Sequence, residues 1–346
     1  RIFRIVFAKS ASSNAVNSLF FLVARTFVAI VQCLPLYGVA LVGRAGGFLF
    51  YYLDARHRRV AVNNLLACLS NSYSKKEILS LARENFCRIG EAYLSALKTA
   101  AIPEEKMGPV LSIKGEENLN LAVRPDGSLP SFLFTIGHFG NFELYAKAGV
   151  FARGYEISTT YRGFNQKWLD RLILSLRNRS GCNFFERRRE GGKLRSFMKQ
   201  PGTITGLLAD QSAGRSGLRL PFFGRPCSVT PAPAIFALRY NLNLHGCLCR
   251  RLGLGRWEIE LYPEIPSRLN GLARPVEDIM SDINAQYELF DVVAMNETIL
   301  NMKYDVENGD MEYLPCSNLN ESKHSFFPNF RQAIMVYYHP VTFIFI

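Results

Sequence analysis

Residues 131–151 read SFLFTIGHFGNFELYAKAGVF, and this stretch decides the fold. Residues 131–136 are mostly apolar and predict a strand, Gly137 to Gly140 predicts a turn, and residues 141–151 have a helix-like pattern. The same alternation recurs downstream, with strand-like runs at 155–161, 182–185 and 203–208 and helix-like runs at 166–177 and 192–198. Strands that alternate with helices predict an α/β domain with a mixed, mainly parallel sheet flanked by helices.

An apolar segment precedes this domain. Residues 16–43 are dominated by Leu, Phe, Val, Ala and Ile, interrupted by Arg25, Gln32 and Pro35. Since about 20 apolar residues span a bilayer, the segment predicts a membrane anchor, either one span or a re-entrant hairpin divided at Pro35; a buried core helix is the alternative. The segment leads into the basic cluster at residues 56–59 and not into a small-residue cleavage site, which argues against a cleaved signal peptide. Because basic residues favour the cytoplasmic side of a membrane, we expect the rest of the chain on that side.

The region between the anchor and the sheet predicts one amphipathic helix. Ser74 and Glu77 form an S-x-x-E capping box, and apolar residues recur behind them at helical spacing until Pro103. We therefore expect a membrane anchor at 1–45 and an α/β domain that begins at residue 46.

Composition narrows the class of partner. The chain has 346 residues, of which 48% are hydrophobic and 20% are charged, and this composition is that of a folded globular protein. Its formal net charge of +12 favours an anionic partner, which could be nucleic acid, a negatively charged membrane face or a phosphorylated substrate. The eight cysteines form no C-x-x-C pair. This spacing argues against a structural zinc site and a disulfide framework, and it favours a reducing compartment.

The sharpest local motif is GHFGNFE at residues 137–143, where a predicted strand gives way to a helix. His138 has the side chain best suited to proton transfer near neutral pH, and Glu143 could orient its ring; a satisfied structural pair is the alternative. The sequence contains no H-E-x-x-H, so no metal is expected. Residues 214–217 lack the G-x-S-x-G elbow of serine hydrolases, and a direct, base-assisted transfer is therefore favoured.

Several blocks in the same order resemble the late acyltransferases of lipid A biosynthesis, the lauroyl and myristoyl transferases of the wider lysophospholipid acyltransferase superfamily. The H-x4-E motif is His138 to Glu143, and the similarity spans roughly residues 15–290. The other matching blocks are Arg58-Arg59, Asn63-Asn64-Leu65, Tyr161-Arg162, Arg177-x-Arg179-Ser180-Gly181, Asp210-Gln211, Pro221-Phe222-Phe223-Gly224 before a helix at 230–240, and finally Asn284 and Glu288.

The resemblance implies a fatty acyl transfer from acyl carrier protein to a hydroxyl of a lipid A precursor, with a glycerolipid acyltransferase-like fold at the cytoplasmic side of a bacterial inner membrane. His138 would be the general base and Glu143 its stabilising partner. Six further residues are candidate substrate contacts: Asn141, Arg162, Arg177, Asp210, Gln211 and Arg215. No cofactor is implied beyond the phosphopantetheine thioester carried by the donor. Helix capping or a turn hydrogen bond is the alternative role for Asp210 and Gln211.

Other interpretations stay open at this point. Arg187 to Arg189 either contact an anionic ligand or form a solvated face, and the apolar block at 221–224 either borders an acyl channel or belongs to the core. An acyltransferase with another glycolipid or lysophospholipid acceptor is the nearest alternative function. The chain has no family counterpart from about residue 290, so the resemblance implies an α/β acyltransferase domain at 46–290 and a divergent C-terminal extension at 291–346. This divergent tail is the one feature that favours a catalytically inactive membrane scaffold. Nucleic-acid binding has only the net charge in its favour.

Overall fold

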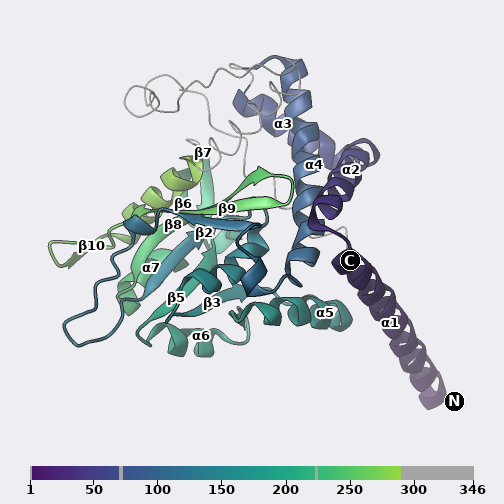
Figure 1. The fold of residues 1–346 in the computed structure, drawn as a ribbon, viewed down its shortest axis with the longest axis horizontal. Coiled ribbons are helices and arrows are strands. Elements are labelled where there is room, and N and C mark those ends of the chain that lie inside the picture. Colours follow the sequence, from purple (N-terminus) through teal and green to yellow (C-terminus); the bar gives the residue numbers. More distant parts are fainter. Residues whose placement is uncertain (1, 70–72, 223–224, 290–346) are drawn as a thin grey trace.

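The computed structural model describes residues 2–69, 73–222 and 225–289 and has the α/β fold expected from the sequence (Figure 1). Its main sheet has seven strands in the order β1-β9-β8-β2-β5-β3-β4. Their bounds are β1 Leu111–Lys114, β2 Phe132–Ile136, β3 Glu156–Tyr161, β4 Asn183–Glu186, β5 Thr203–Leu208, β8 Asn243–Gly253 and β9 Arg256–Glu264. Two small hairpins join β6 (Leu218–Phe222) to β7 (Arg225–Val229) and β10 (Arg268–Leu269) to β11 (Leu272–Ala273).

All neighbouring strands of the main sheet run parallel except β8 and β9. The prediction of a mixed, mainly parallel sheet is therefore confirmed. Every residue of β2 is buried, as expected for a central strand covered on both faces. Because β2, β5, β3 and β4 are parallel neighbours, their carboxyl ends meet along one edge of the sheet, where open α/β sheets place their ligands.

The segment at 141–151 differs from the helix-like prediction in its pitch. It forms the 3-10 helix η3 (Phe142–Phe151) and not an α-helix. Its apolar residues do not form a single buried face: Leu144 and Ala146 are buried, Phe142 and Tyr145 are half-buried, and Phe151 is exposed. Three α-helices form where the sequence predicts them after this segment: α5 (Lys167–Arg177), α6 (Gly191–Met198) and α7 (Ala232–Tyr240).

The N-terminal apolar region is divided near Pro35, as expected. Helix α1 (Ile2–Cys33) ends before it and α2 (Leu36–Leu53) begins after it, followed by α3 (Ala55–Leu69). Among the described helices, α2 is long and apolar enough to cross a membrane, by length and composition, and residues 17–33 of α1 form a shorter apolar helix. The apolar region thus continues to Leu53, beyond the boundary expected at residue 45.

Helix α4 (Lys75–Thr99) begins with the predicted capping box of Ser74 and Glu77. It crosses α2 at very short range, and a Cβ atom added to Gly90 would lie 2.2 Å from the carbonyl oxygen of Gly43. Glycine at this crossing lets the two backbones touch, which fixes the apolar helices against the α/β domain.

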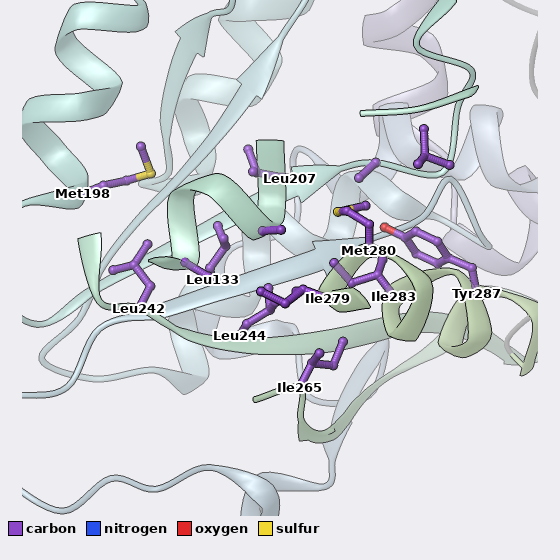
Figure 2. Packing of buried hydrophobic residues seen from close by; sticks show 14 of the residues in the cluster. Leu133, Met198, Leu207, Leu242, Leu244, Ile265, Ile279, Met280, Ile283 and Tyr287 are labelled. Carbon is purple, nitrogen blue, oxygen red and sulfur yellow. The ribbon is translucent and has the colours of Figure 1, made fainter. Parts of the chain in front are cut away.

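The largest buried core cluster lies on the face of the sheet covered by α7 and the C-terminal helix at 276–289. Figure 2 shows Ile279, Ile283 and Tyr287 projecting from that helix toward Leu133 and Leu244 of the sheet. This packing brings the C-terminal helix to the carboxyl end of β2, next to the predicted catalytic motif. The extension expected at 291–346 lies outside the described residues.

Candidate functional site

His138 lies just beyond the carboxyl end of β2, and Asp210 lies just beyond the end of the neighbouring β5. The Nδ1 atom of His138 is 2.8 Å from Oδ1 of Asp210, and the backbone N–H of His138 donates to Oδ2 at 2.8 Å. A carboxylate on Nδ1 fixes the tautomer in which Nδ1 carries the proton and Nε2 is the basic nitrogen. The arrangement can therefore accept a proton from a bound hydroxyl.

The loop that carries His138 depends on a glycine. Gly140 has a φ of +53°, and a Cβ atom there would lie 2.6 Å from the carbonyl oxygen of Cys249 in β8. Only glycine suits both the left-handed conformation and this close approach. The sharp turn aims the His138 ring across Phe142, whose ring centroid is 5.1 Å away.

Glu143 lies at the start of η3, but its partner is Arg177 and not His138. The guanidinium of Arg177, at the end of α5, donates from Nε to Oε2 at 3.0 Å and from Nη2 to Oε1 at 2.5 Å. The His–Glu pair expected from the five-residue spacing is thus replaced by two pairs, His138–Asp210 and Glu143–Arg177. A 3-10 helix begins directly after Asn141, and the first turn of η3 carries Glu143 toward α5.

Both pairs border one large cavity of ≈ 1460 Å³, to which His138, Glu143 and Arg177 contribute. Apolar side chains of α1, α4, α5 and η3 form much of its wall, including Phe20, Phe27, Val28, Tyr93, Leu97, Phe142, Trp168, Leu172 and Leu176. The arrangement offers an apolar space beside a proton-accepting histidine, which suits a substrate with a long hydrocarbon chain.

The other sequence-predicted residues separate into three groups. Arg162 and Gln211 are exposed and line the cavity with His138. Asn141 also borders it but is fully buried; its Nδ2 donates to Oγ1 of Thr99 at 3.2 Å, and its Oδ1 has no hydrogen-bond partner among the described residues. Arg215 lies in a short 3-10 turn before β6 and is not part of the cavity lining.

Electrostatics at the cavity wall keep two further groups protonated. Burial, reinforced by the negative charge of Glu143, raises the pKa of the Tyr93 hydroxyl to about 12. Burial and Glu143 likewise raise the pKa of the Cys182 thiol to about 12, although Arg177 opposes this shift. Cys182 is therefore a poor nucleophile at neutral pH, since the thiolate is the reactive form.

The structure adds a contact that sequence reasoning missed. Tyr287 is fully buried, and its hydroxyl donates to the carbonyl oxygen of Ile136, the last residue of β2, at 3.1 Å. Asn284 of the same helix donates from Nδ2 to the carbonyl oxygen of Pro221 in β6 at 3.0 Å. Asn284, which matches the family pattern, is a sequence signal that this helix has a role. Nothing in the sequence indicates that the helix packs at the end of β2.

No cluster of three or more His, Cys, Asp or Glu side chains that could hold a metal occurs within residues 2–69, 73–222 and 225–289. The cavity lining is apolar with a few polar groups, among them His138, Glu143 and the arginines. These are groups that accept protons or bind anions.

A sequence model of the bacterial lipid A biosynthesis acyltransferase family matches residues 8–297, which is most of the chain. The chain belongs to this family. It is therefore an acyltransferase by descent, and the match includes the His138–Asp210 and Glu143–Arg177 pairs as well as the apolar helices α1 and α2. No curated protein sequence shows a significant match to the chain. The apolar α2 agrees with the membrane association typical of the family.

Proposed function

We propose that this acyltransferase moves a fatty acyl group from an acyl carrier protein thioester to a hydroxyl of a lipid A precursor, at the cytoplasmic side of a bacterial inner membrane. The observation that carries the proposal is the His138–Asp210 pair at the wall of a large, mainly apolar cavity in a chain of this family. A fatty acyl chain needs the apolar space, and ester formation needs the base.

In the proposed reaction, Nε2 of His138 accepts the proton of the acceptor hydroxyl while the hydroxyl oxygen attacks the carbonyl carbon of the thioester. Asp210 holds the Nδ1 proton and stabilises the imidazolium that forms. The tetrahedral intermediate collapses as the C–S bond breaks and the C–O ester bond remains. The thiolate of the donor then takes the proton from His138, so that the ring returns to its starting state.

The cationic groups in the cavity suit the two anionic substrates. Arg162 is exposed at the cavity wall, where it can contact a phosphate of the acceptor or the developing oxyanion. Arg177 is held by Glu143, so it contributes less net charge and fixes the relative position of η3 and α5. We assign the orienting role expected for Glu143 to Asp210 on this geometry.

Acyl transfer to a tetra-acylated lipid A precursor, with product mass as the readout, tests the proposal. Membranes containing the wild type should give product with acyl carrier protein thioesters. His138→Ala should give none, whereas Arg215→Ala, outside the cavity, should retain activity. Absence of product from a folded, membrane-bound wild type would contradict the lipid A assignment, and product only with a lysophospholipid or another glycolipid would identify a different acceptor.

A further inference from the structure

A compact turn at the edge of the main sheet carries three consecutive arginines. Arg187, Arg188 and Arg189 follow β4 directly, and all three are exposed. Helix α6 begins two residues later and carries the exposed cations Lys193 and Arg195, and the exposed Lys199 caps its C-terminal end. The Nζ atom of Lys193 lies 2.7 Å from Oε1 of Glu190, so Lys193 contributes less net charge than the others. The segment from β4 through α6 therefore presents a basic surface to solvent.

Buried contacts hold this turn in one shape. The carboxylate of Glu186, at the end of β4, accepts from the backbone N–H groups of Arg188 and Arg189 at 2.9 Å and of Gly163 at 3.4 Å. Burial raises the pKa of this carboxyl, but the three N–H donors outweigh burial and lower the pKa. The backbone N–H of Arg187 also donates to the carbonyl oxygen of Tyr161 at 3.0 Å. A backbone fixed in this way means that a partner pays only for ordering the three side chains and not for ordering the turn itself.

The turn lies on the catalytic edge of the sheet. Glu186 pairs with Tyr161, so the end of β4 is next to the end of β3, and β5 and β2 follow in order. At a strand spacing of about 4.8 Å, three steps separate β4 from β2, or roughly 14 Å. Arg187 and Arg162 line the same cavity as His138. A partner seated on the turn would therefore face the mouth of the cavity.

The surroundings of the turn favour a protein partner over lipid. No large hydrophobic side chain is exposed in the described residues between Phe151 and Ile235, which include β4 and α6. The exposed apolar side chains gather instead on α1 and α2, from Leu19 to Leu53. A cationic surface without exposed large apolar side chains has no groups to insert into a bilayer, and its charge complements an acidic protein surface. Charge alone can also attract anionic lipid, so lipid binding is an outcome of the test below.

We propose that the arginine turn (Arg187 to Arg189) and the exposed cations of α6 form the docking surface for an acidic carrier protein, which presents its acyl thioester to the cavity. This inference rests on the proposed function, because it supplies the contact for the donor of that reaction. Charge complementarity would speed encounter and orient the thioester arm toward His138.

The test removes charge from the turn and leaves the cavity lining intact. In the full chain in nanodiscs of zwitterionic lipid, Arg188→Gln/Arg189→Gln should raise the KM for an acyl carrier protein thioester about tenfold or more, with kcat unchanged. Transfer from a small acyl-pantetheine thioester should not change. Arg188→Lys/Arg189→Lys should recover most of the affinity, and higher salt should raise the wild-type KM toward that of the variant.

A matched control variant is Lys75→Gln/Lys76→Gln, which removes the same charge from two neighbouring exposed residues of α4. It should leave the KM for the carrier unchanged. Equal effects of the two variants would overturn the docking surface, as would an unchanged KM in the arginine variant. Weaker binding to phosphatidylglycerol vesicles with an unchanged KM would identify the turn as a lipid contact instead.

Direct binding separates this inference from the proposed function. Carrier protein immobilised on a biosensor should bind the wild type and should bind the Arg188→Gln/Arg189→Gln variant much more weakly. A wild type that binds the carrier through the arginines but acylates no lipid A precursor would overturn the proposed acceptor alone. A wild type that acylates the precursor from the small thioester but does not bind the carrier would overturn the docking surface alone.

Discussion

Asp210 holds His138 at two points, the ring and the backbone, with both contacts at 2.8 Å. One carboxylate therefore sets the tautomer of the imidazole and the position of the loop that carries it. Because β2 and β5 are parallel neighbours in the sheet, the two residues that follow their ends are brought together by the strand pairing.

Asp210→Asn should preserve the fold and remove most of the activity. The amide is nearly isosteric but carries no charge to stabilise the imidazolium, and kcat should fall roughly 100- to 10,000-fold. Initial rates and thermal unfolding of the same preparations would check this. Asp278→Asn, at an exposed carboxylate of the C-terminal helix, is the control and should behave as wild type. Near-normal turnover in Asp210→Asn would remove this residue from the mechanism.

The Glu143–Arg177 pair should matter to stability more than an exposed pair. Its side chains are only 27% and 18% exposed, so removing either partner leaves a charge in a poorly solvated wall. We expect Glu143→Gln and Arg177→Gln each to cost about 1–3 kcal/mol, and the double variant to cost less than their sum. Lys114→Gln, in a pair whose lysine is 56% exposed, should cost below about 1 kcal/mol. Chemical denaturation measures the free energy of unfolding of these four variants. If the losses of the two single variants add up to that of the double variant, Glu143 and Arg177 are not coupled.

Two adjacent glycines of α2 should respond differently to substitution by alanine. A Cβ atom at Gly47 would lie 2.0 Å from the carbonyl oxygen of Phe86 in α4, whereas a Cβ atom at Gly46 meets nothing within 4 Å. Gly47→Ala should lower the unfolding temperature, because the helices must separate. Gly46→Ala should be neutral or stabilise by about 0.5–1 kcal/mol, since alanine favours a helix. Thermal unfolding in detergent checks both, and equal responses would contradict the close crossing.

Acid should destabilise the fold through His245. This side chain is fully buried, and burial lowers its pKa although its bond to the carbonyl oxygen of Tyr262 and the charge of Glu264 oppose the shift. The unfolded chain then binds a proton more readily than the folded one, so stability is complete above the ordinary histidine pKa of about 6.5 and falls as the pH drops below it. Unfolding temperatures should decline between about pH 6.5 and 5. The decline should be shallower in His245→Phe, and an equal slope would contradict this account.

Much of the fold could be predicted from the sequence because its signals are local. The strand at 203–208, the break near Pro35 and the capping box of Ser74 and Glu77 all follow from short-range spacing, and the structure confirms each. The β8–β9 antiparallel pair and the β6–β7 hairpin were not foreseen. Phe223 and Gly224 of the block at 221–224 lie outside the described residues.

The roles of the candidate site residues stay predictions, but the structure shows which of them line one cavity and which pair with one another. His138, Glu143, Arg162, Arg177 and Gln211 do gather at one cavity. Five residues of spacing suggested that His138 meets Glu143, but strand order is a tertiary property, and the adjacency of β2 and β5 brings Asp210 to the ring instead. Likewise, only packing reveals that the hydroxyl of Tyr287 reaches the end of β2.

The buried carboxylate of Glu91 has a consequence for where the enzyme can work. It accepts from Arg44 of α2 at 3.3 Å, from Arg251 of β8 at 2.9 Å and from the backbone N–H of Gly255 at 3.3 Å. The apolar helix and the sheet are thereby joined through one side chain. Under the proposed function, α2 seated in lipid would also set the height of His138 above the bilayer, and the acceptor would reach the cavity by lateral diffusion and present its hydroxyl at that height.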